Sequence, residues 1–178
     1  MKTVVFLFHP SYEQSRVNKA LVNGLDNDIE VRNLYELYPD FNINVSNEQA
    51  VMEAADRVVL QFPMFWYSSP ALVQQWEEKV LEHGWAYGSA GNVLQGKELI
   101  IAVSPGADNY GRDGFAKYTI HELLRPFQDT SRLIGMHYLT PFVTIGASSI
   151  SDQVLQEQVI KYNNYLHQES IPVLGDFE

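Results

Sequence analysis

Short apolar runs alternate with amphipathic stretches along this chain. The runs at 3–8, 57–62 and 99–103 are rich in apolar and β-branched residues, which is typical of strands covered on both faces. Two weaker runs, at 29–34 and 136–145, predict further strands, and a proline within the last one indicates an edge or a bend. The hydrophobic pattern therefore predicts a sheet of parallel, largely buried strands.

Helical periodicity marks the stretches between these runs. Ser15 and Ser46 are placed to cap helices, and Pro70 suits the first turn of another. Two more helices are expected at about 117–127 and around 155–166, where apolar residues recur on one face. Strands that alternate with helices in this way predict an α/β fold with a doubly wound parallel sheet and helices on both faces.

Composition narrows the possible functions. A chain of 178 residues fits one domain, 1–178, and it contains no cysteine, which excludes disulfides, a thiol nucleophile and thiolate metal sites. The formal charge of −10, with 12 scattered basic residues, argues against a nucleic-acid surface. The sequence shows neither a signal peptide nor an apolar stretch long enough to cross a membrane, so a cytoplasmic protein is expected.

Three loops carry unusual chemistry at the ends of predicted strands. They cover 9–18, 64–67 and 104–110. The carboxyl ends of the strands in a doubly wound sheet open on one edge, which is where such folds bind ligands. We therefore expect these loops to converge on one crevice.

The first loop precedes a helix and brings an imidazole, hydroxyls and an arginine to its start. Backbone N–H groups and the helix dipole at such a position bind phosphate. The segment lacks both the G-x-G-x-x-G and the G-x-x-x-x-G-K-[ST] patterns, which disfavours a Rossmann dinucleotide site and a P-loop. Ser15 as a simple helix cap is the alternative interpretation.

The other two loops suit a flat aromatic ligand. Trp66 and its neighbours could stack on a ring, although aromatic residues near a strand end are more often core. Gly106 allows close approach of the backbone, and Tyr110 offers a phenol, but a structural turn and a surface tyrosine explain both equally well.

Other chemistry has little support. The remaining histidines have no metal-ligand spacing and are interpreted as structural, so no metal site is predicted; they are His83, His121, His137 and His167. No serine is flanked as Gly-x-Ser-x-Gly, which leaves a hydrolase without support.

Four motifs in order closely resemble those of the flavodoxin-like NAD(P)H:quinone oxidoreductases. They lie at 9–18 (His-Pro, then Ser and Asn), 34–42 (LYxLYPDFN), 62–70 (FPMxWYSxP) and 82–88 (EHGWAYG), so the resemblance spans nearly the whole chain. Bacterial members include general stress proteins and ancillary flavoproteins of potassium efflux systems. The resemblance implies a five-stranded sheet in the order 2-1-3-4-5, non-covalent FMN, NAD(P)H as co-substrate and a homodimer.

The resemblance also assigns residues to the cofactor. The first loop would surround the FMN phosphate, the second would hold the isoalloxazine ring, and the third would meet its pyrimidine edge. The residues implied are, in that order, His9, Ser15, Arg16, Val17 and Asn18; Met64, Phe65, Trp66 and Tyr67; and Ser104, Pro105, Gly106 and Ala107.

Two departures from the family pattern concern the third loop. Relatives usually carry Thr-Thr-Gly-Gly at 104–107, and Pro105 removes one backbone donor. Tyr110 matches the tyrosine of a proton relay known in mammalian members, but no histidine follows it at comparable spacing.

The sequence thus predicts an NAD(P)H dehydrogenase (quinone), in which hydride passes through FMN to a quinone or a similar small electrophile. Two alternatives stay open: a regulatory subunit of a potassium efflux transporter, and a one-electron flavodoxin. The choice between NADH and NADPH is not predicted.

Overall fold

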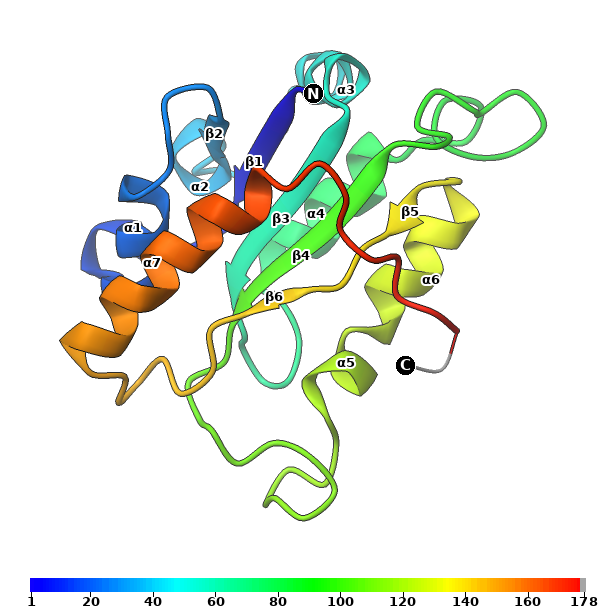
Figure 1. Cartoon of the computed structure of the whole chain (residues 1–178). Coiled ribbons are helices and arrows are strands. Elements are labelled where there is room, and N and C mark those ends of the chain that lie inside the picture. The colour runs from blue at the N-terminus through cyan, green and yellow to red at the C-terminus, as the bar shows by residue number, and fades with distance from the viewer. Residues whose placement is uncertain (177–178) are drawn as a thin grey trace.

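A parallel sheet forms the centre of the molecule. The computed structural model describes residues 1–176, and its strand order is β2-β1-β3-β4-β5, with β6 also paired to β4 (Figure 1). Every pairing is parallel, as the alternation of strands and helices predicts. The strands are β1 Thr3–Leu7, β2 Glu30–Asn33, β3 Arg57–Pro63, β4 Glu98–Ser104, β5 His137–Tyr138 and β6 Phe142–Val143.

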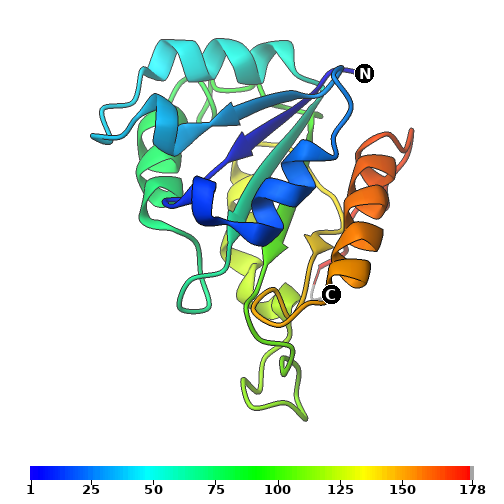
Figure 2. The same cartoon turned by 90° about the vertical axis from the view of Figure 1, so that its left-hand side faces the viewer.

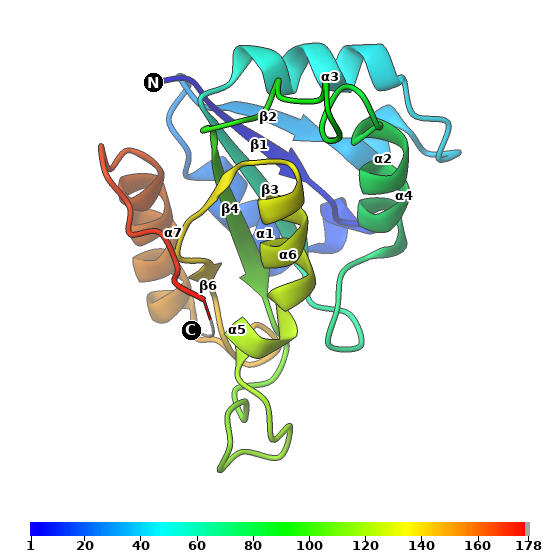
Figure 3. The ribbon, with the colours of Figure 1, turned by 90° about the vertical axis from the view of Figure 1, so that its right-hand side faces the viewer.

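Helices cover both faces of this sheet. One face carries α1 (Arg16–Asn23) and α7 (Asp152–Leu166), and the other carries the remaining long helices (Figures 2 and 3). Those of the second face are α3 Val45–Ala54, α4 Ala71–Val80 and α6 Arg125–Leu133, accompanied by the short α2 Leu34–Leu37 and α5 Ile120–Leu123. The predicted doubly wound fold and its strand order are confirmed.

Two apolar cores lie on opposite faces because side chains alternate along each strand. On β3, Leu60 and Phe62 join the core under α3, α4 and α6, whereas Val59 joins the core under α1 and α7. The second core also depends on close helix packing, since a Cβ at Gly24 would lie 2.1 Å from Val159 Cγ1. Glycine at that position lets α1 and α7 pack against each other.

Two predicted helices begin elsewhere than expected. The helix α3 is capped by Asn44 rather than Ser46, and its buried residues are Glu48 and Met52. Glu48 is tolerated inside because Arg32 and the Tyr38 hydroxyl both bond its carboxylate.

The helix predicted at 117–127 is replaced by two helices. Thr119 and Glu122 form a capping box that starts α5, and the chain then breaks at Leu124 before α6. The cap is the stronger local signal, because its two reciprocal hydrogen bonds satisfy N–H groups that an earlier start would leave unpaired. The helical region therefore runs to Leu133, beyond the predicted end.

The predicted fifth strand is split. Proline at 141 cannot donate to the ladder, and the two short strands on either side of it pair separately with β4. Thr140 N donates instead to Pro172 O at 2.9 Å, so the C-terminal segment lies beside the gap.

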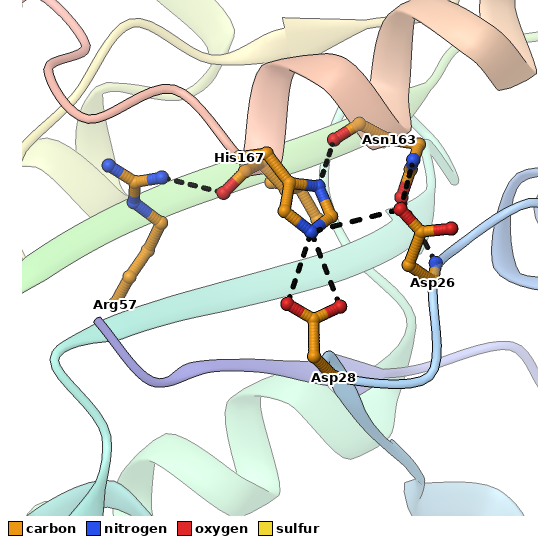
Figure 4. Close-up of polar contacts among 6 residues, drawn as sticks. Asp26, Asp28, Arg57, Asn163 and His167 are labelled. Atoms are coloured by element: carbon orange, nitrogen blue, oxygen red, sulfur yellow. Dashed lines mark hydrogen bonds and ion pairs between the residues drawn. The ribbon is translucent and has the colours of Figure 1, made fainter.

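The C-terminal end of α7 forms hydrogen bonds with the loop before β2 (Figure 4). His167 Nδ1 donates to Asn163 O at 2.8 Å, and its Nε2 lies 3.3 Å from both Asp28 oxygens. Asp26 lies nearby and accepts from Asn163 Nδ2. The hydrogen bond to Asn163 and the neighbouring carboxylates raise the pKa of His167, so protonation strengthens this contact.

The described part of the chain contains no helix with both the length and the apolar character that a membrane span requires.

Candidate functional site

A cleft of about 450 Å³ opens at the carboxyl edge of the sheet. Loops that follow β1, β3 and β4 line it, as expected, together with a fourth loop that follows β6. The lining residues are His9, Ser11, Gln14, Ser15, Arg16, Val17, Asn18, Pro63, Met64, Phe65, Ser104, Gly106, Ala147 and Ser148.

The first loop presents the start of α1 to the cleft. Ser15 caps the helix, since its Oγ accepts from Asn18 N at 3.1 Å. The first N–H groups of a helix have no acceptor within it, and Arg16 and Val17, the first two residues of α1, line the cleft. Ser15 therefore both caps the helix and lines a site of the kind that binds anions.

His9 adds a defined donor to this loop. Ser11 N donates to His9 Nδ1 at 3.1 Å, which places the proton of the neutral ring on Nε2. Burial lowers the pKa of His9, so the ring is neutral at pH 7.

Arg16 has partners of its own. Its guanidinium donates to Ile150 O at 2.6 Å and forms an ion pair with Asp152 at the start of α7. The side chain thus joins the first loop to the fourth, and Asp152 offsets part of its charge.

The second loop is a tight turn with two aromatic residues at its tip. Phe65 and Ser68 exchange both backbone hydrogen bonds, and the residues between them, Trp66 and Tyr67, have φ values of 49° and 63°. Asn-Gly is the usual pair at such positions, because left-handed backbone costs other residues about 1–2 kcal/mol each. The turn nevertheless exposes 93% of Trp66. Strain that displays a large ring in solvent indicates a binding function.

The third and fourth loops support each other. The N–H groups of Gly146, Ala147 and Ser148 donate to carbonyls of residues 105–107. A Cβ at Gly106 would lie 2.8 Å from Ser148 Oγ, so glycine lets the third and fourth loops pack closely.

The structure brings together nine of the predicted site residues at the cleft. These are His9, Ser15, Arg16, Val17, Asn18, Met64, Phe65, Ser104 and Gly106. The other five lie outside this lining, and their assignment stays a prediction: Trp66, Tyr67, Pro105, Ala107 and Tyr110. Of these, Tyr67 and Tyr110 pack edge to face at 6.4 Å.

Sequence reasoning missed the fourth loop. Ala147 and Ser148 line the cleft because β6 ends at the same edge as β4. The small, polar stretch 146–149 directly after an apolar run is the signal that points to them.

The comparisons with known proteins agree with this geometry. A family model described as a flavodoxin-like fold matches residues 1–166. This chain belongs to the flavodoxin-like family. Among its curated relatives, General stress protein 14 of Bacillus subtilis (strain 168) is 46% identical over 172 residues, which cover 94% of this chain and 98% of the relative.

Two further curated relatives carry other names. The NAD(P)H oxidoreductase YrkL of Bacillus subtilis (strain 168), described as uncharacterized, is 46% identical over 173 residues, which cover 95% of this chain and 99% of the relative. The glutathione-regulated potassium-efflux ancillary protein KefF of Klebsiella aerogenes is 40% identical over 167 residues, with 92% and 93% covered.

Solved structures of this flavodoxin-like family are also similar. General stress protein 14 of Treponema denticola, solved with FMN, has a TM-score of 0.86 at 36% identity, with 93% of this chain and 98% of that chain covered. An NADPH-quinone reductase from P. pentosaceus has a TM-score of 0.87 at 29% identity, with 96% and 100% covered. A protein described as a thermophilic tryptophan halogenase from Streptomycin violaceusniger has a TM-score of 0.92 at 44% identity, with 94% and 100% covered.

Proposed function

We propose that this flavodoxin-like protein is an FMN-dependent NAD(P)H oxidoreductase that reduces a quinone or a similar small electrophile. The observation that carries the proposal is the cleft, which combines a helix start suited to a phosphate with an apolar wall of Met64 and Phe65, directly before the strained aromatic turn. The names of the relatives support it, as does the FMN complex of the Treponema protein.

The phosphate end of the cleft fits FMN. The start of α1 offers unpaired N–H groups, the Ser15 cap fixes their direction, and His9 adds a neutral donor. The volume of about 450 Å³ is within the range of cofactor pockets.

The ring end fits as well. Met64 and Phe65 give the cleft an apolar wall, and Gly106 keeps the opposite side free of a Cβ. In the proposal Trp66 and Tyr67 extend this wall, while Pro105 and Ala107 meet the edge of the ring.

Bound FMN supplies the hydride acceptor and donor that the chain lacks, because no side chain here is a redox group. The protein binds and orients the cofactor and holds protons near it. Burial first, and Tyr67 second, raise the pKa of Tyr110, so its phenol keeps its proton at neutral pH. Tyr110, which packs against Tyr67 of the second loop, is proposed as the proton donor near the cleft.

A homodimer belongs to this proposal. The resemblance implies one, but the aromatic residues of the loop 85–87 pack partly on the protein's own core. The exposed rings of Trp66, Phe115 and Tyr118 provide a better argument, because large rings are costly in water and these extend from loops around the cleft. A second copy of the chain that covers them would complete the site.

Regulation of a potassium efflux transporter is the second candidate function. The similarity to KefF favours it, and in this role any flavin would serve binding rather than turnover.

Titration with FMN and with riboflavin tests the proposal. The two ligands differ only in the phosphate, so FMN is expected to bind with 1:1 stoichiometry and at least about 100-fold more tightly. Quenching of flavin fluorescence measures both affinities. Equal affinities would contradict the phosphate site, and no binding of either would contradict the cofactor.

A further inference from the structure

A buried polar chain runs from α7 to the cleft. Gln61 lies near the end of the central strand β3 and is 0% exposed, on the face that otherwise packs apolar side chains under α1 and α7. Such a group is stable only if its hydrogen bonds are satisfied. It accepts from the Tyr162 hydroxyl at 2.9 Å, and its Nε2 donates to Asn18 Oδ1 at 3.2 Å.

The chain ends at the cleft. Asn18 Nδ2 donates to Ser104 Oγ at 2.8 Å, and Ser104 lies at the carboxyl end of β4. Asn18, Ser104 and Tyr162 are all at least nine-tenths buried, like Gln61. Four side chains from four different elements therefore form one connected network.

The direction of this network is fixed by a backbone carbonyl. Gln61 Nε2 also donates to Asn18 O, at 3.4 Å. A carbonyl can only accept, so the NH₂ side of the Gln61 amide must face α1, and its oxygen must face Tyr162. The Asn18 oxygen then accepts from Gln61, and the Asn18 NH₂ group must face Ser104.

The consequence falls on the Ser104 hydroxyl. Its oxygen already accepts from Asn18, so its own proton is not used within the network. If both amides were reversed, the Asn18 oxygen would face Ser104 and take that proton. The orientation of the Gln61 amide thus determines whether the Ser104 hydroxyl proton is free to donate into the cleft or is already donated to Asn18.

We infer that Gln61 is a positioning residue that orients Asn18 so that the Ser104 hydroxyl donates a hydrogen bond to the bound cofactor. This inference rests on the proposed FMN function. It also explains how the third loop tolerates Pro105, which lacks a backbone N–H: a side-chain donor stands next to the missing one. A donor near the flavin favours its reduced, more negative form.

Replacement of Gln61 and of Ser104 tests the inference. Gln61→Met keeps volume but removes the amide NH₂ that donates to Asn18 and the oxygen that accepts from Tyr162, and Ser104→Ala removes the hydroxyl. Each is expected to weaken FMN binding about 10-fold, to shift the flavin absorption bands and to lower the midpoint potential. Ser104→Thr keeps the hydroxyl and is expected to match the wild type in all three.

Two tyrosines on α7 provide matched controls. Tyr162→Phe removes a hydrogen bond to Gln61, but the Asn18 backbone carbonyl still fixes the orientation of the Gln61 amide. The variant is therefore expected to lower thermal stability while FMN affinity stays within about 2-fold. Tyr165 donates to Thr140 O, outside the network. Tyr165→Phe is therefore expected to change stability alone.

The outcomes separate the inference from the proposed function. A wild-type protein that binds no FMN overturns the proposed function and this role with it. A wild-type protein that binds FMN while Gln61→Met keeps its affinity, spectrum and potential overturns only the inference.

A measurement on the wild-type protein covers the case in which Gln61→Met does not fold. Nuclear Overhauser contacts from the Asn18 side-chain NH₂ to the Ser104 β-protons are expected. Contacts from that NH₂ toward Gln61 instead would overturn the inference.

Discussion

Two residues beside the cleft expose aromatic side chains at the cost of a strained backbone conformation. Trp66 and Tyr67 occupy left-handed backbone that glycine or asparagine would adopt more easily, and yet both rings are displayed. Ser15 shows no such conflict, because the same hydroxyl caps α1 and lines the cleft. A functional residue is therefore easiest to recognise where its type is one that rarely adopts the backbone conformation found there.

Replacement of Trp66 by glycine is expected to move stability and binding in opposite directions. Relief of the left-handed conformation should stabilise the fold by about 1 kcal/mol, which raises the melting temperature by about 2–4 °C for a chain of this size. Loss of the ring should weaken FMN binding. Thermal unfolding and fluorescence titration measure the two effects, with Trp66→Phe as the comparison that keeps an aromatic ring. A Trp66→Gly variant that binds FMN as tightly as the wild type would contradict the stacking role.

At the scale of elements, the sequence predicts the long strands. It does not predict element boundaries where two local signals, such as a helix cap and helical periodicity, disagree. The runs at 57–62 and 99–103 are strands whose apolar side chains are buried on both faces of the sheet. The start of α5 was missed because a capping box outweighs periodicity. Three of the cleft's loops were predictable from strand ends, whereas the fourth depends on how a broken strand pairs with β4.

Glu77 on α4 should make stability depend on pH. Burial raises the pKa of its carboxyl from 4.5 to about 7 in the folded protein. The folded state then binds a proton more tightly than the unfolded state, so stability falls as pH rises from about 4.5 to 7. Glu77→Gln removes this penalty and is expected to be about 1–3 kcal/mol more stable than the wild type at pH 8.

Thermal unfolding between pH 4.5 and 8 measures this difference. The exposed neighbour Glu78 provides the control Glu78→Gln, which changes the net charge equally. If Glu77→Gln and Glu78→Gln show the same pH dependence, the burial of Glu77 has no effect on stability.

The whole molecule is a sheet whose functional loops gather at one edge, with a long loop at 105–119 that extends beyond it (Figure 1). This loop carries Phe115, which is 81% exposed. Composition and pattern predict the sheet, but they do not show how far such a loop extends from it. In the proposed homodimer, a second copy of the chain covers these exposed rings.

Sedimentation at micromolar concentration tests the dimer. The wild-type protein is expected to sediment as a dimer, since burial of exposed rings stabilises association. Phe115→Ser is expected to shift the equilibrium toward the monomer without a loss of helix signal in circular dichroism. A wild-type monomer at this concentration would contradict the proposal.

The most direct test of the account is an anaerobic titration of the FMN-loaded protein with NADPH and then with NADH, followed by the absorbance of the flavin. We expect rapid and full bleaching by at least one of them, and recovery of the absorbance when a quinone is added. A flavin that is bound but not bleached by either nucleotide would contradict the assignment as an NAD(P)H oxidoreductase and would favour a regulatory or electron-carrier role.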